Sequence, residues 1–389
     1  MQDFKRAIEP ELLAAAREYP VVTVTGPRQA GKTTLVKKVF PNKAYVNLEA
    51  PDIRAAAEED PRGFLNTLPQ GGILDEIQRV PSLLSYIQLI VDEKKTPGLF
   101  ILTGSHQLAL HGAITQSLAG RTAILNLLPF TISELAGGGV DLSLDQYLLN
   151  GFLPRIYSDK LNPTKAYRNY LQTYIERDVR QILHVRDLKV FQHFIKLCAG
   201  RIGSVFNKES LGNELGISSQ TINQWLSVLE ASFIIQQISP YFENFGKRVI
   251  KAPKIFFNDV GLATYLLGIE NTDQLIRDPL RGFLVENLVV LELVKTRLNK
   301  GLEPNLYYYR DNHKNEVDII YKQSNELIPI EIKASQTYHP DFLKGIKYYE
   351  SIANSRAKTG YLVYAGAHEQ SIGNIKILNF KHAHEIVSS

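Results

Sequence analysis

A glycine-rich stretch that ends in Lys32 and Thr33 contains the residue types that point most directly to chemistry. It follows the β-branched run 21–25, and apolar residues at helical spacing continue after it. Backbone N–H groups of such a turn converge on the phosphates of a nucleotide, and the positive end of the following helix adds to the attraction. Lys32 is expected to reach the β- and γ-phosphates, and Thr33 to place its hydroxyl on Mg²⁺. The expected nucleotide contacts in this stretch are Gly26, Pro27, Arg28, Gln29, Ala30, Gly31, Lys32, Thr33 and Thr34.

Two adjacent carboxylates, Asp75 and Glu76, end the apolar run at residues 72–74. Asp75 is expected to hold Mg²⁺ directly or through a water molecule. Glu76 is expected to orient or deprotonate the water that attacks the γ-phosphate, which makes it the candidate catalytic residue. The alternative is an acidic strand end without a ligand, but a neighbouring phosphate-binding loop favours the functional interpretation.

Three polar residues further along the chain are candidates for contacts with the γ-phosphate. Thr103 and Ser105 follow the apolar run 100–102, and either hydroxyl can sense the phosphate. Small polar residues are also ordinary at strand ends, so the choice between the two stays open. Arg121 precedes the run 122–127, a position from which a catalytic guanidinium reaches the phosphates of a neighbouring subunit. A surface ion pair is the alternative for Arg121.

A second group of candidate metal ligands lies near the end of the chain. Asp318 begins a predicted strand, and Glu331 and Lys333 lie in a second one, where alternation places their side chains on one face. Two converging carboxylates bind Mg²⁺, while the ammonium group of a lysine can hold or activate the attacking water. Glu286, on a long predicted helix, is a further acidic candidate. Asp followed later by Glu-x-Lys is frequent by chance, so the motif alone does not establish a nuclease.

The elements that position the first site alternate between strands and helices from residue 8 to about 134. This alternation predicts a parallel sheet covered by helices, which is an α/β fold. Helices are expected at 54–66 and 83–95. The predicted strands cover residues 21–25, 44–47, 72–75, 99–103 and 122–127.

The rest of the chain changes character twice. Residues 147–199 have helical patterns, and two helices joined by a tight turn are expected at 208–231, followed by the strand of a wing at 233–239. A long helix at 280–298 then precedes a β-rich stretch, with a boundary expected near 271–278. The strands predicted in that stretch cover residues 306–310, 317–321, 327–334 and 359–364.

The second helix of the predicted winged helix contains no Lys or Arg between Gln220 and Ser227, although its Gln and Asn side chains can read base edges. Phosphate contacts require cations, and a short basic run supplies them just after the predicted wing strand. A solvated basic loop is the alternative interpretation of that run. Its members are Lys247, Arg248, Lys251 and Lys254.

Composition limits the remaining choices. A chain of 389 residues is too long for one ordinary core, and its formal charge of +4 permits contact with nucleic acid without requiring it. The single Cys198 excludes a disulfide framework and fits a reducing compartment, so a cytoplasmic location is expected. No membrane association is expected, because no run of eighteen apolar residues occurs.

These motifs together resemble the AAA-type P-loop ATPases with a DUF4143 C-terminal region. The resemblance covers nearly the whole chain and implies an ATPase domain, a helical lid-like segment, a winged helix and a restriction-endonuclease-like domain of the PD-(D/E)xK type, in which Val317 takes the place of the Pro. It also implies a homo-oligomer. The implied boundaries are 1–135, 136–200, 201–268 and 269–389. The motifs that carry the resemblance are the glycine-rich loop and residues 74–78, 102–105, 118–121, 150–154, 176–179 and 254–262.

Three functional hypotheses follow from these observations. The first is an ATPase that uses ATP and Mg²⁺ and is coupled to a nuclease-like region able to bind DNA rather than RNA. The second is an ATP-regulated DNA nuclease in which Glu286, Asp318 and Glu331 bind the metal and Lys333 is catalytic. The third is an ATPase that regulates a protein-interaction module built on an inactive nuclease fold.

Overall fold

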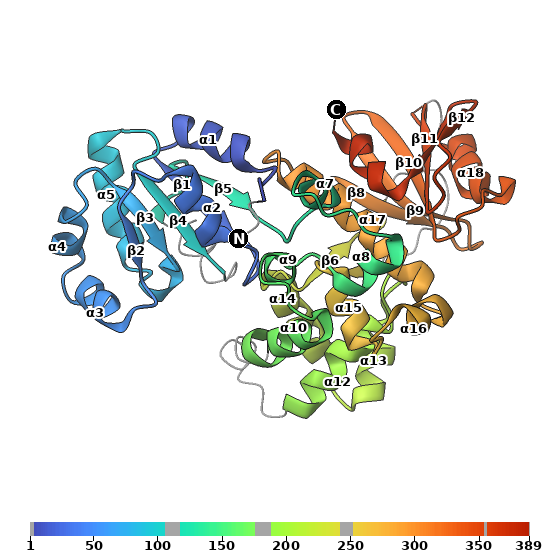
Figure 1. Cartoon of the computed structure of the whole chain (residues 1–389), viewed down its shortest axis with the longest axis horizontal. Coiled ribbons are helices and arrows are strands. Elements are labelled where there is room, and N and C mark those ends of the chain that lie inside the picture. The colour runs from blue at the N-terminus through green and yellow to red at the C-terminus, as the bar shows by residue number, and fades with distance from the viewer. Residues whose placement is uncertain (1–3, 106–116, 176–187, 242–251, 354–355, 389) are drawn as a thin grey trace.

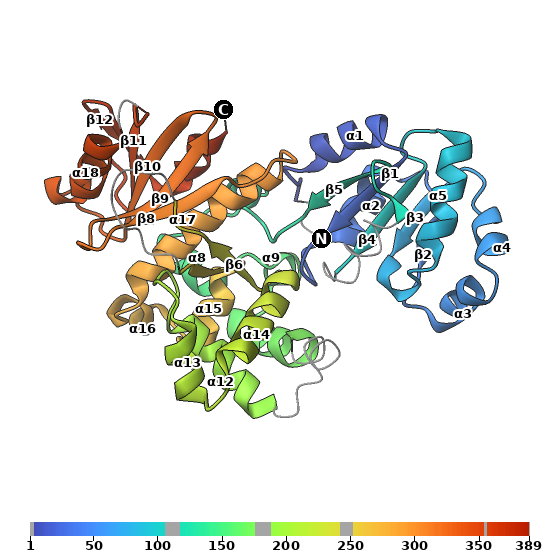
Figure 2. The ribbon, with the colours of Figure 1, turned by 180° about the vertical axis from the view of Figure 1, so that it is seen from behind.

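The computed structural model describes residues 4–105, 117–175, 188–241, 252–353 and 356–388. Figure 1 shows a sheet with its helices at one side, a second sheet at the other, and a group of helices below and between them. The same three groups are seen from behind in Figure 2. None of the helices in the described part of the chain is long and apolar enough to cross a membrane.

The first sheet has five parallel strands in the order β2-β3-β4-β1-β5. This confirms the predicted parallel α/β architecture. Because the strands are parallel, the segments that follow β1, β3 and β4 all leave from the same edge of the sheet. The strands are β1 (Val21–Thr25), β2 (Tyr45–Asn47), β3 (Gly72–Asp75), β4 (Phe100–Gly104) and β5 (Thr122–Asn126).

Alternating side chains of this sheet pack on helices at both faces. Val22 and Val24 of β1 pack with α1 and α2, while Leu74 and Leu102 of the neighbouring strands pack on the opposite face with α3, α4 and α5. The helical stretch predicted at 54–66 is two helices, because Pro61 cannot continue the first and Asp60 caps the second through the Gly63 amide. The helices are α1 (Glu9–Glu18), α2 (Lys32–Val39), α3 (Pro51–Glu59), α4 (Pro61–Asn66) and α5 (Leu83–Lys94).

The middle of the chain is mostly helical. A helix-turn-helix (α13 and α14) is followed by strands β6 (Ile235–Ile238) and β7 (Lys254–Phe257), which pair in antiparallel fashion as the wing. The stretch 271–278, near which a boundary is expected, includes a helix, α16, that packs against α8 and against the long helix α17 (Arg281–Leu298). The helices are α7 (Ile132–Gly137), α8 (Leu144–Asn150), α9 (Pro154–Ser158), α10 (Pro163–Tyr170), α12 (Leu188–Ala199), α13 (Lys208–Leu215), α14 (Ser219–Ala231), α15 (Val260–Leu266) and α16 (Thr272–Arg277).

The second sheet is mixed and follows the long helix α17 (Arg281–Leu298). Its strand order is β12-β13-β11-β10-β9-β8, with β10, β11 and β13 parallel and the outer pairs antiparallel. The helix α18 (Lys344–Ile352) packs on it. The strands are β8 (Leu306–Arg310), β9 (Glu316–Gln323), β10 (Glu326–Lys333), β11 (Gly360–Tyr364), β12 (Gln370–Ile372) and β13 (Ile375–Asn379).

One hydrophobic core joins the middle and C-terminal parts of the chain. It includes Phe194 and Trp225 of the helical region, Val289 of α17 and Ile330 of β10, so it crosses the boundaries expected at 200 and 268. The core also includes Phe130, which lies on the segment leaving the first sheet. The first sheet is therefore joined to the rest of the molecule through residues 127–132 and the N-terminal segment.

Candidate functional site

The glycine-rich loop connects the end of β1 to the start of α2. Gly26 and Gly31 have positive φ angles of 148° and 91°. A Cβ atom at position 26 would lie 2.0 Å from the carbonyl oxygen of Leu127, so only glycine fits there. The close approach fixes the loop against the chain that leaves β5.

Lys32 lies at the start of α2, and only 6% of its surface is exposed. Its ammonium group donates to the carbonyl oxygens of Gly26 and Pro27 across 3.0 Å and 2.9 Å. The charge is thus held at the mouth of the loop. To bind a phosphate, the ammonium group has to exchange these bonds for phosphate oxygens.

Asp75 is the centre of a buried hydrogen-bond network at the end of β3. Its Oδ2 accepts from Thr33 Oγ1 at 2.9 Å and from the Tyr45 hydroxyl at 2.8 Å, and its Oδ1 accepts from Thr103 Oγ1. Burial, followed by the hydrogen bond and charge of Asp75, raises the pKa of Tyr45 well above its usual value. Tyr45 could not be recognised from sequence as part of the site, because β2 has to pair with β3 before its hydroxyl can reach Asp75.

Glu76 follows Asp75 with a left-handed backbone, φ 58° and ψ 47°, which is uncommon for a glutamate. Its amide donates to Thr103 Oγ1 at 3.3 Å, and its carboxylate accepts from Ser105 Oγ at 3.1 Å and from the side chain of Gln78. The two candidates left open by the sequence thus have different partners. The Thr103 hydroxyl contacts the Asp75 carboxylate and the Glu76 amide, whereas the Ser105 hydroxyl contacts the Glu76 carboxylate.

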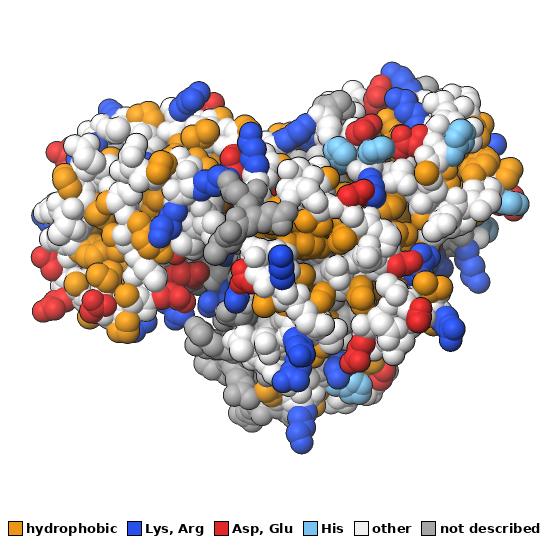
Figure 3. Space-filling view, in the orientation of Figure 1, with side chains coloured by type: hydrophobic (Ala, Val, Ile, Leu, Met, Phe, Trp, Pro, Cys, Tyr) orange, Lys and Arg blue, Asp and Glu red, His pale blue; other side chains and the backbone are white. Residues whose placement is uncertain are grey.

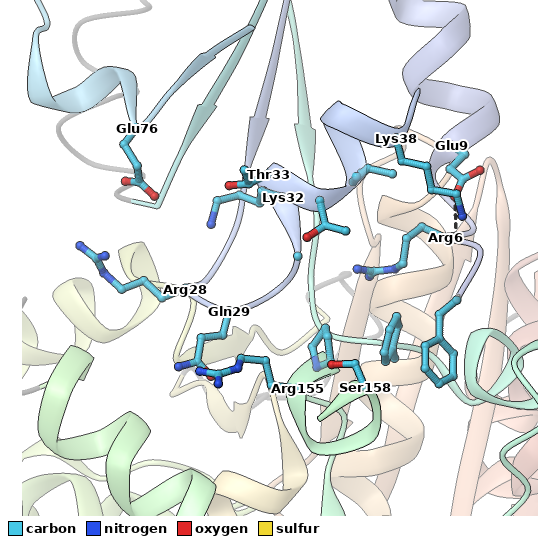
Figure 4. Close-up of a pocket in the computed structure, with 16 residues that line it drawn as sticks. Arg6, Glu9, Arg28, Gln29, Lys32, Thr33, Lys38, Glu76, Arg155 and Ser158 are labelled. Atoms are coloured by element: carbon cyan, nitrogen blue, oxygen red, sulfur yellow. Dashed lines mark hydrogen bonds and ion pairs between the residues drawn. The ribbon is translucent and has the colours of Figure 1, made fainter. Parts of the chain in front are cut away.

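A cavity of about 460 Å³ lies beside the loop. Figure 4 shows Glu76, Arg28, Lys32 and Thr33 around one end of it, and Arg6, Glu9 and Lys38 around the other. Between these two ends, residues of α9 form a wall of the cavity. The remaining residues that line the cavity are Phe4, Gln29, Gly31, Thr34, Leu35, Phe130, Pro154, Arg155 and Ser158.

Arg6 and Phe130 form the wall of this cavity opposite Glu76. The Arg6 guanidinium lies 4.9 Å from the centre of the Phe130 ring. It donates to the carbonyl oxygens of Ala30 at 2.8 Å and Leu128 at 2.7 Å, and its Nε is 3.0 Å from the buried carboxylate of Glu134. The N-terminal segment is therefore fixed to the glycine-rich loop.

Arg155 and Ser158 bring the helical region into the cavity. Arg155 forms a half-exposed ion pair with Asp159 at 2.9 Å. No local motif identified Arg6, Arg155 or Ser158 as site residues, since each comes from a segment distant from the loop in sequence. Arg28 lies 3.8 Å from Glu49, and Figure 4 shows it on the same side of the cavity as Glu76.

Arg121 lies at the opposite end of the sheet from the glycine-rich loop. Register pairs Thr122 with Val21, the first residue of β1, whereas the loop follows the last residue, Thr25. The five-residue strand separates the two ends by about 16 Å. Arg121 forms a bidentate ion pair with Asp92 at 2.5 Å and 2.9 Å on the surface, so it does not contact the phosphates of its own subunit.

The structure brings together the three residues predicted in the C-terminal strands. Lys333 Nζ lies 2.5 Å from Glu331 and 3.4 Å from Asp318, and Asp318 also accepts from the Ile332 amide at 2.8 Å. Burial, with the negative charge of Asp318 adding to it, raises the pKa of Glu331 to about 9. A Cβ atom on Gly345 of α18 would lie 2.1 Å from Glu331, so the helix closes over this carboxyl group.

Glu286 forms an ion pair with Lys254, a member of the basic run for which a phosphate contact and a solvated loop were the two interpretations. Lys254 is instead the first residue of β7 and is 1% exposed. Its ammonium group lies 3.0 Å from Glu286 and 2.7 Å from Glu316. Burial raises the pKa of Glu286 to about 7, against the attraction of Lys254. Lys247, Arg248 and Lys251, the other members of the predicted basic run, and residues 176–179 lie outside the described residues.

The acidic residues of this region do not gather into a ready metal site. Among the residues that the structure describes, no three His, Cys, Asp or Glu side chains are arranged so that they could hold a metal ion. The negative charges of Asp318 and Glu316 are instead balanced by the ammonium groups of Lys333 and Lys254. The arrangement is a closed ion-pair cluster.

The fold and the first site together define a P-loop ATPase: a parallel sheet whose β1 ends in the glycine-rich loop and whose β3 ends in Asp75 and Glu76. Family models agree with this class. Residues 18–136 match an AAA domain, residues 141–273 match a domain of unknown function (DUF8612), and residues 281–383 match a domain of unknown function (DUF4143).

Two curated relatives show how far the family resemblance extends. The uncharacterized proteins Rv2008c of Mycobacterium tuberculosis and Mb2031c of Mycobacterium bovis are each 30% identical over 368 residues, which are 94% of this chain and 80% of theirs. The chain belongs to the same family as these proteins. It is an AAA-type P-loop ATPase with a DUF4143 C-terminal region.

Solved structures are more distant. The Walker-type ATPase PABY2304 of Pyrococcus abyssi is 15% identical, with 68% of this chain and 96% of that chain covered and a TM-score of 0.44. AMPPCP-bound DnaA from Aquifex aeolicus is 13% identical, with 57% and 85% covered and a TM-score of 0.30. These values describe a remote likeness.

Proposed function

We propose that this protein hydrolyses ATP with Mg²⁺ in the cavity between the glycine-rich loop and α9. The observation that carries the proposal is the contact of Thr33 Oγ1 with Asp75 at 2.9 Å, next to the buried ammonium group of Lys32. A hydroxyl and a carboxylate are oxygen donors that suit Mg²⁺, and the 460 Å³ cavity has room for a nucleotide. When bound, Mg²⁺ would neutralise charge on the β- and γ-phosphates.

Side chains and main-chain amides of the protein supply the other groups that ATP hydrolysis requires. Lys32 binds the phosphates, and the main-chain amides of the loop orient them. Glu76 holds the attacking water and accepts its proton, in an orientation fixed by Ser105 and Gln78. Phe4 and Phe130, with ring centres 4.8 Å apart, give the far end of the cavity an apolar wall suited to a base.

Calorimetry with a non-hydrolysable ATP analogue and Mg²⁺ tests this proposal. The wild type should take up the analogue, and Lys32→Ala should not, because the ammonium group at the loop is lost. Lys94→Ala, which removes an exposed lysine from α5, is the matched control and should bind like the wild type. A wild type that takes up no nucleotide would end the proposal.

A second candidate function concerns the C-terminal region, which we propose is a regulated interaction module on an inactive nuclease fold. Support comes from Lys254, whose buried ammonium group already pairs with Glu286 and Glu316. The close approach of Gly345 to Glu331 adds to it, since a scissile phosphate needs access to this carboxylate. Plasmid cleavage with Mg²⁺ or Mn²⁺ that Lys333→Ala abolishes would instead establish the nuclease.

The winged helix is the part of the chain that we propose for a nucleic-acid partner. The exposed positions of α14 are Ser219, Gln220, Asn223, Gln224 and Ser227, without a cation. Ser227 and Glu230 also line a cleft of about 430 Å³ shared with Asn126 and Leu128 of the ATPase part. On the face shown in Figure 3, Lys and Arg side chains are scattered among acidic ones. DNA affinity, where present, should fall steeply with salt.

A homo-oligomer is the last part of the proposal. Since Arg121 lies at the far end of its own sheet from the glycine-rich loop, a catalytic role for it would require the phosphates of a neighbouring subunit. Its surface pair with Asp92 would then break on assembly. Light scattering with and without ATP should detect assembly, and Arg121→Ala should lower turnover in the assembled state without lowering ATP affinity of the monomer.

A further inference from the structure

Helix α17 carries four polar side chains that are almost fully buried. Glu286, Asn287, Glu292 and Lys295 are 7%, 0%, 2% and 2% exposed. Burying such groups is unfavourable unless each finds a partner. In this structure each of the four has such a partner: Glu286 and Asn287 bond to β7, and Glu292 and Lys295 bond to residues 130–132. Helix α17 is thus tied to two distant segments by directional contacts as well as by packing.

The C-terminal half of α17 is bonded to the chain that leaves the ATPase sheet. Lys295 Nζ donates to the carbonyl oxygen of Phe130 at 2.7 Å and lies 4.0 Å from the centre of the Phe152 ring. Glu292 accepts from the Ile132 amide at 2.9 Å and pairs with Lys295 at 3.4 Å. Two adjacent side chains of the C-terminal region thus fix the main chain on both sides of residue 131.

Phe130 lines the nucleotide cavity, and Phe152 lies close in sequence to one of its walls. The Phe130 ring lines the cavity beside Arg6, which is bonded to the Ala30 carbonyl of the glycine-rich loop. Phe152 lies two residues before Pro154, where α9 begins as the other wall. A displacement of Lys295 would therefore move the cavity walls that come from residues 130 and 154.

The N-terminal half of α17 is bonded to the C-terminal ion-pair cluster and the wing. Glu286 pairs with Lys254, and Asn287 both donates to and accepts from the main chain of Phe257 in β7, at 2.9 Å and 2.6 Å. Glu286 and Lys295 are nine positions apart, about 14 Å along a helix. Because α17 is packed on nearly all sides, it transmits a shift at one end to the other rather than bending.

We infer that Lys295 and Glu292 are positioning residues of the ATPase, and that α17 couples the nucleotide cavity to the cluster around Lys254. The inference rests on the proposed function, since it names the regulation of the same cavity. Neither residue touches the nucleotide; they act through Phe130 and Phe152. Coupling of this kind is reciprocal, so a partner that binds at the cluster changes nucleotide affinity by the same factor that nucleotide changes partner affinity.

Lys295→Met tests the positioning role. It keeps the length and the apolar stem of the side chain but removes the hydrogen bond to Phe130 and the ion pair with Glu292. The kcat/KM for ATP should fall by about tenfold or more, as expected for a small displacement of a site wall. Lys295→Arg can still donate to Phe130 and stack on Phe152, so it should restore most of the loss. Lys300→Met, an exposed lysine just after the same helix, is the control and should keep wild-type kinetics.

Hydrogen exchange on the wild-type protein tests the coupling without a variant that has to fold. A non-hydrolysable ATP analogue with Mg²⁺ should slow exchange in residues 281–298 as well as in residues 130–132. A folded Lys295→Met with wild-type kcat/KM, or unchanged exchange in 281–298 when the analogue is bound, would overturn the inference. Failure of the wild type to bind the analogue is a separate result, which removes the proposed function itself.

Discussion

The hydroxyl group of Ser105, after β4, donates to the carboxylate of Glu76, after β3, across 3.1 Å. The side chain of Gln78 bonds to both. Together with the left-handed backbone at Glu76, these contacts hold its carboxylate at the edge of the cavity. The glutamate is thus oriented before any nucleotide arrives, which lowers the reorganisation needed for catalysis.

Glu76→Gln should separate nucleotide binding from turnover. The amide keeps the size of the side chain but cannot accept a proton, so we expect near wild-type affinity for ATP and turnover lowered by about 10²- to 10⁴-fold. Steady-state phosphate release and calorimetry measure the two effects. Glu93→Gln, at an exposed position of α5, is the control. Wild-type turnover by Glu76→Gln would show that another residue positions the water.

Asp75→Asn should change the Mg²⁺ dependence of the reaction. The amide oxygen can still accept from Thr33 or Tyr45, but the negative charge that attracts the metal is lost. We expect the Mg²⁺ concentration for half-maximal turnover to rise by about tenfold or more. A magnesium titration at saturating ATP measures it, with the exposed Asp52→Asn of α3 as the control. An unchanged midpoint would place the metal elsewhere.

The first site could be predicted from sequence because its parts are encoded locally. Lys32 and Thr33 follow β1, and Asp75 and Glu76 end β3 or follow it, so each pair is recognisable from a short motif. Parallel pairing then brings the two strand ends to one edge of the sheet. The positions of these residues could be expected before the structure was known.

Other site residues have no local signal. Arg6 reaches the loop from the N-terminal segment, and Arg155 reaches the cavity from a helix more than a hundred residues away. Lys254 shows most clearly what the sequence alone cannot predict. In sequence it belongs to a basic run, but docking of β7 against α17 buries its ammonium group between Glu286 and Glu316. Only tertiary packing distinguishes a solvated lysine from a buried counter-ion.

The wild-type protein should not cleave plasmid DNA with Mg²⁺ or Mn²⁺, with or without ATP. The reason is that Lys254 and Lys333 already balance the negative charges of Glu316 and Asp318, which a metal would need. Agarose gels of supercoiled plasmid measure nicking directly. Metal-dependent nicking that is lost in Lys333→Ala but kept in Lys322→Ala, a lysine on the adjacent strand β9, would show that the cluster opens and cuts.

Arg6→Met should destabilise the protein and weaken nucleotide binding together. Removing the guanidinium leaves the Glu134 carboxylate buried without its charged partner, at a cost of about 3–5 kcal/mol. The Ala30 carbonyl of the glycine-rich loop also loses its donor. Urea unfolding measures the first effect, with Lys358→Met as a control, because its ion pair with Glu326 is exposed to solvent and contributes little to stability. Equal losses of unfolding free energy in Arg6→Met and Lys358→Met would contradict the prediction.

The raised pKa of Glu331 predicts how stability depends on pH. Burial and the neighbouring charge of Asp318 raise this pKa from 4.5 to about 9, so the folded state keeps a proton that the unfolded state releases. The stabilisation is therefore fully present below about pH 4.5 and is lost as pH rises toward 9. The pKa of Glu286 is raised from 4.5 to about 7, so its contribution to stability is lost in the same way as pH rises from 4.5 to about 7.

Glu331→Gln isolates that contribution, because the amide cannot titrate. The free energy of unfolding, measured in urea at several pH values between 5 and 9, should fall with pH less steeply for the variant than for the wild type. The difference in slope for one proton is limited to about 1.4 kcal/mol per pH unit. Glu326→Gln, a surface position of the same strand, should keep the wild-type slope. If Glu331→Gln keeps it as well, the Glu331 carboxyl is ionised in the folded protein, and the cluster carries one more negative charge available to a metal ion.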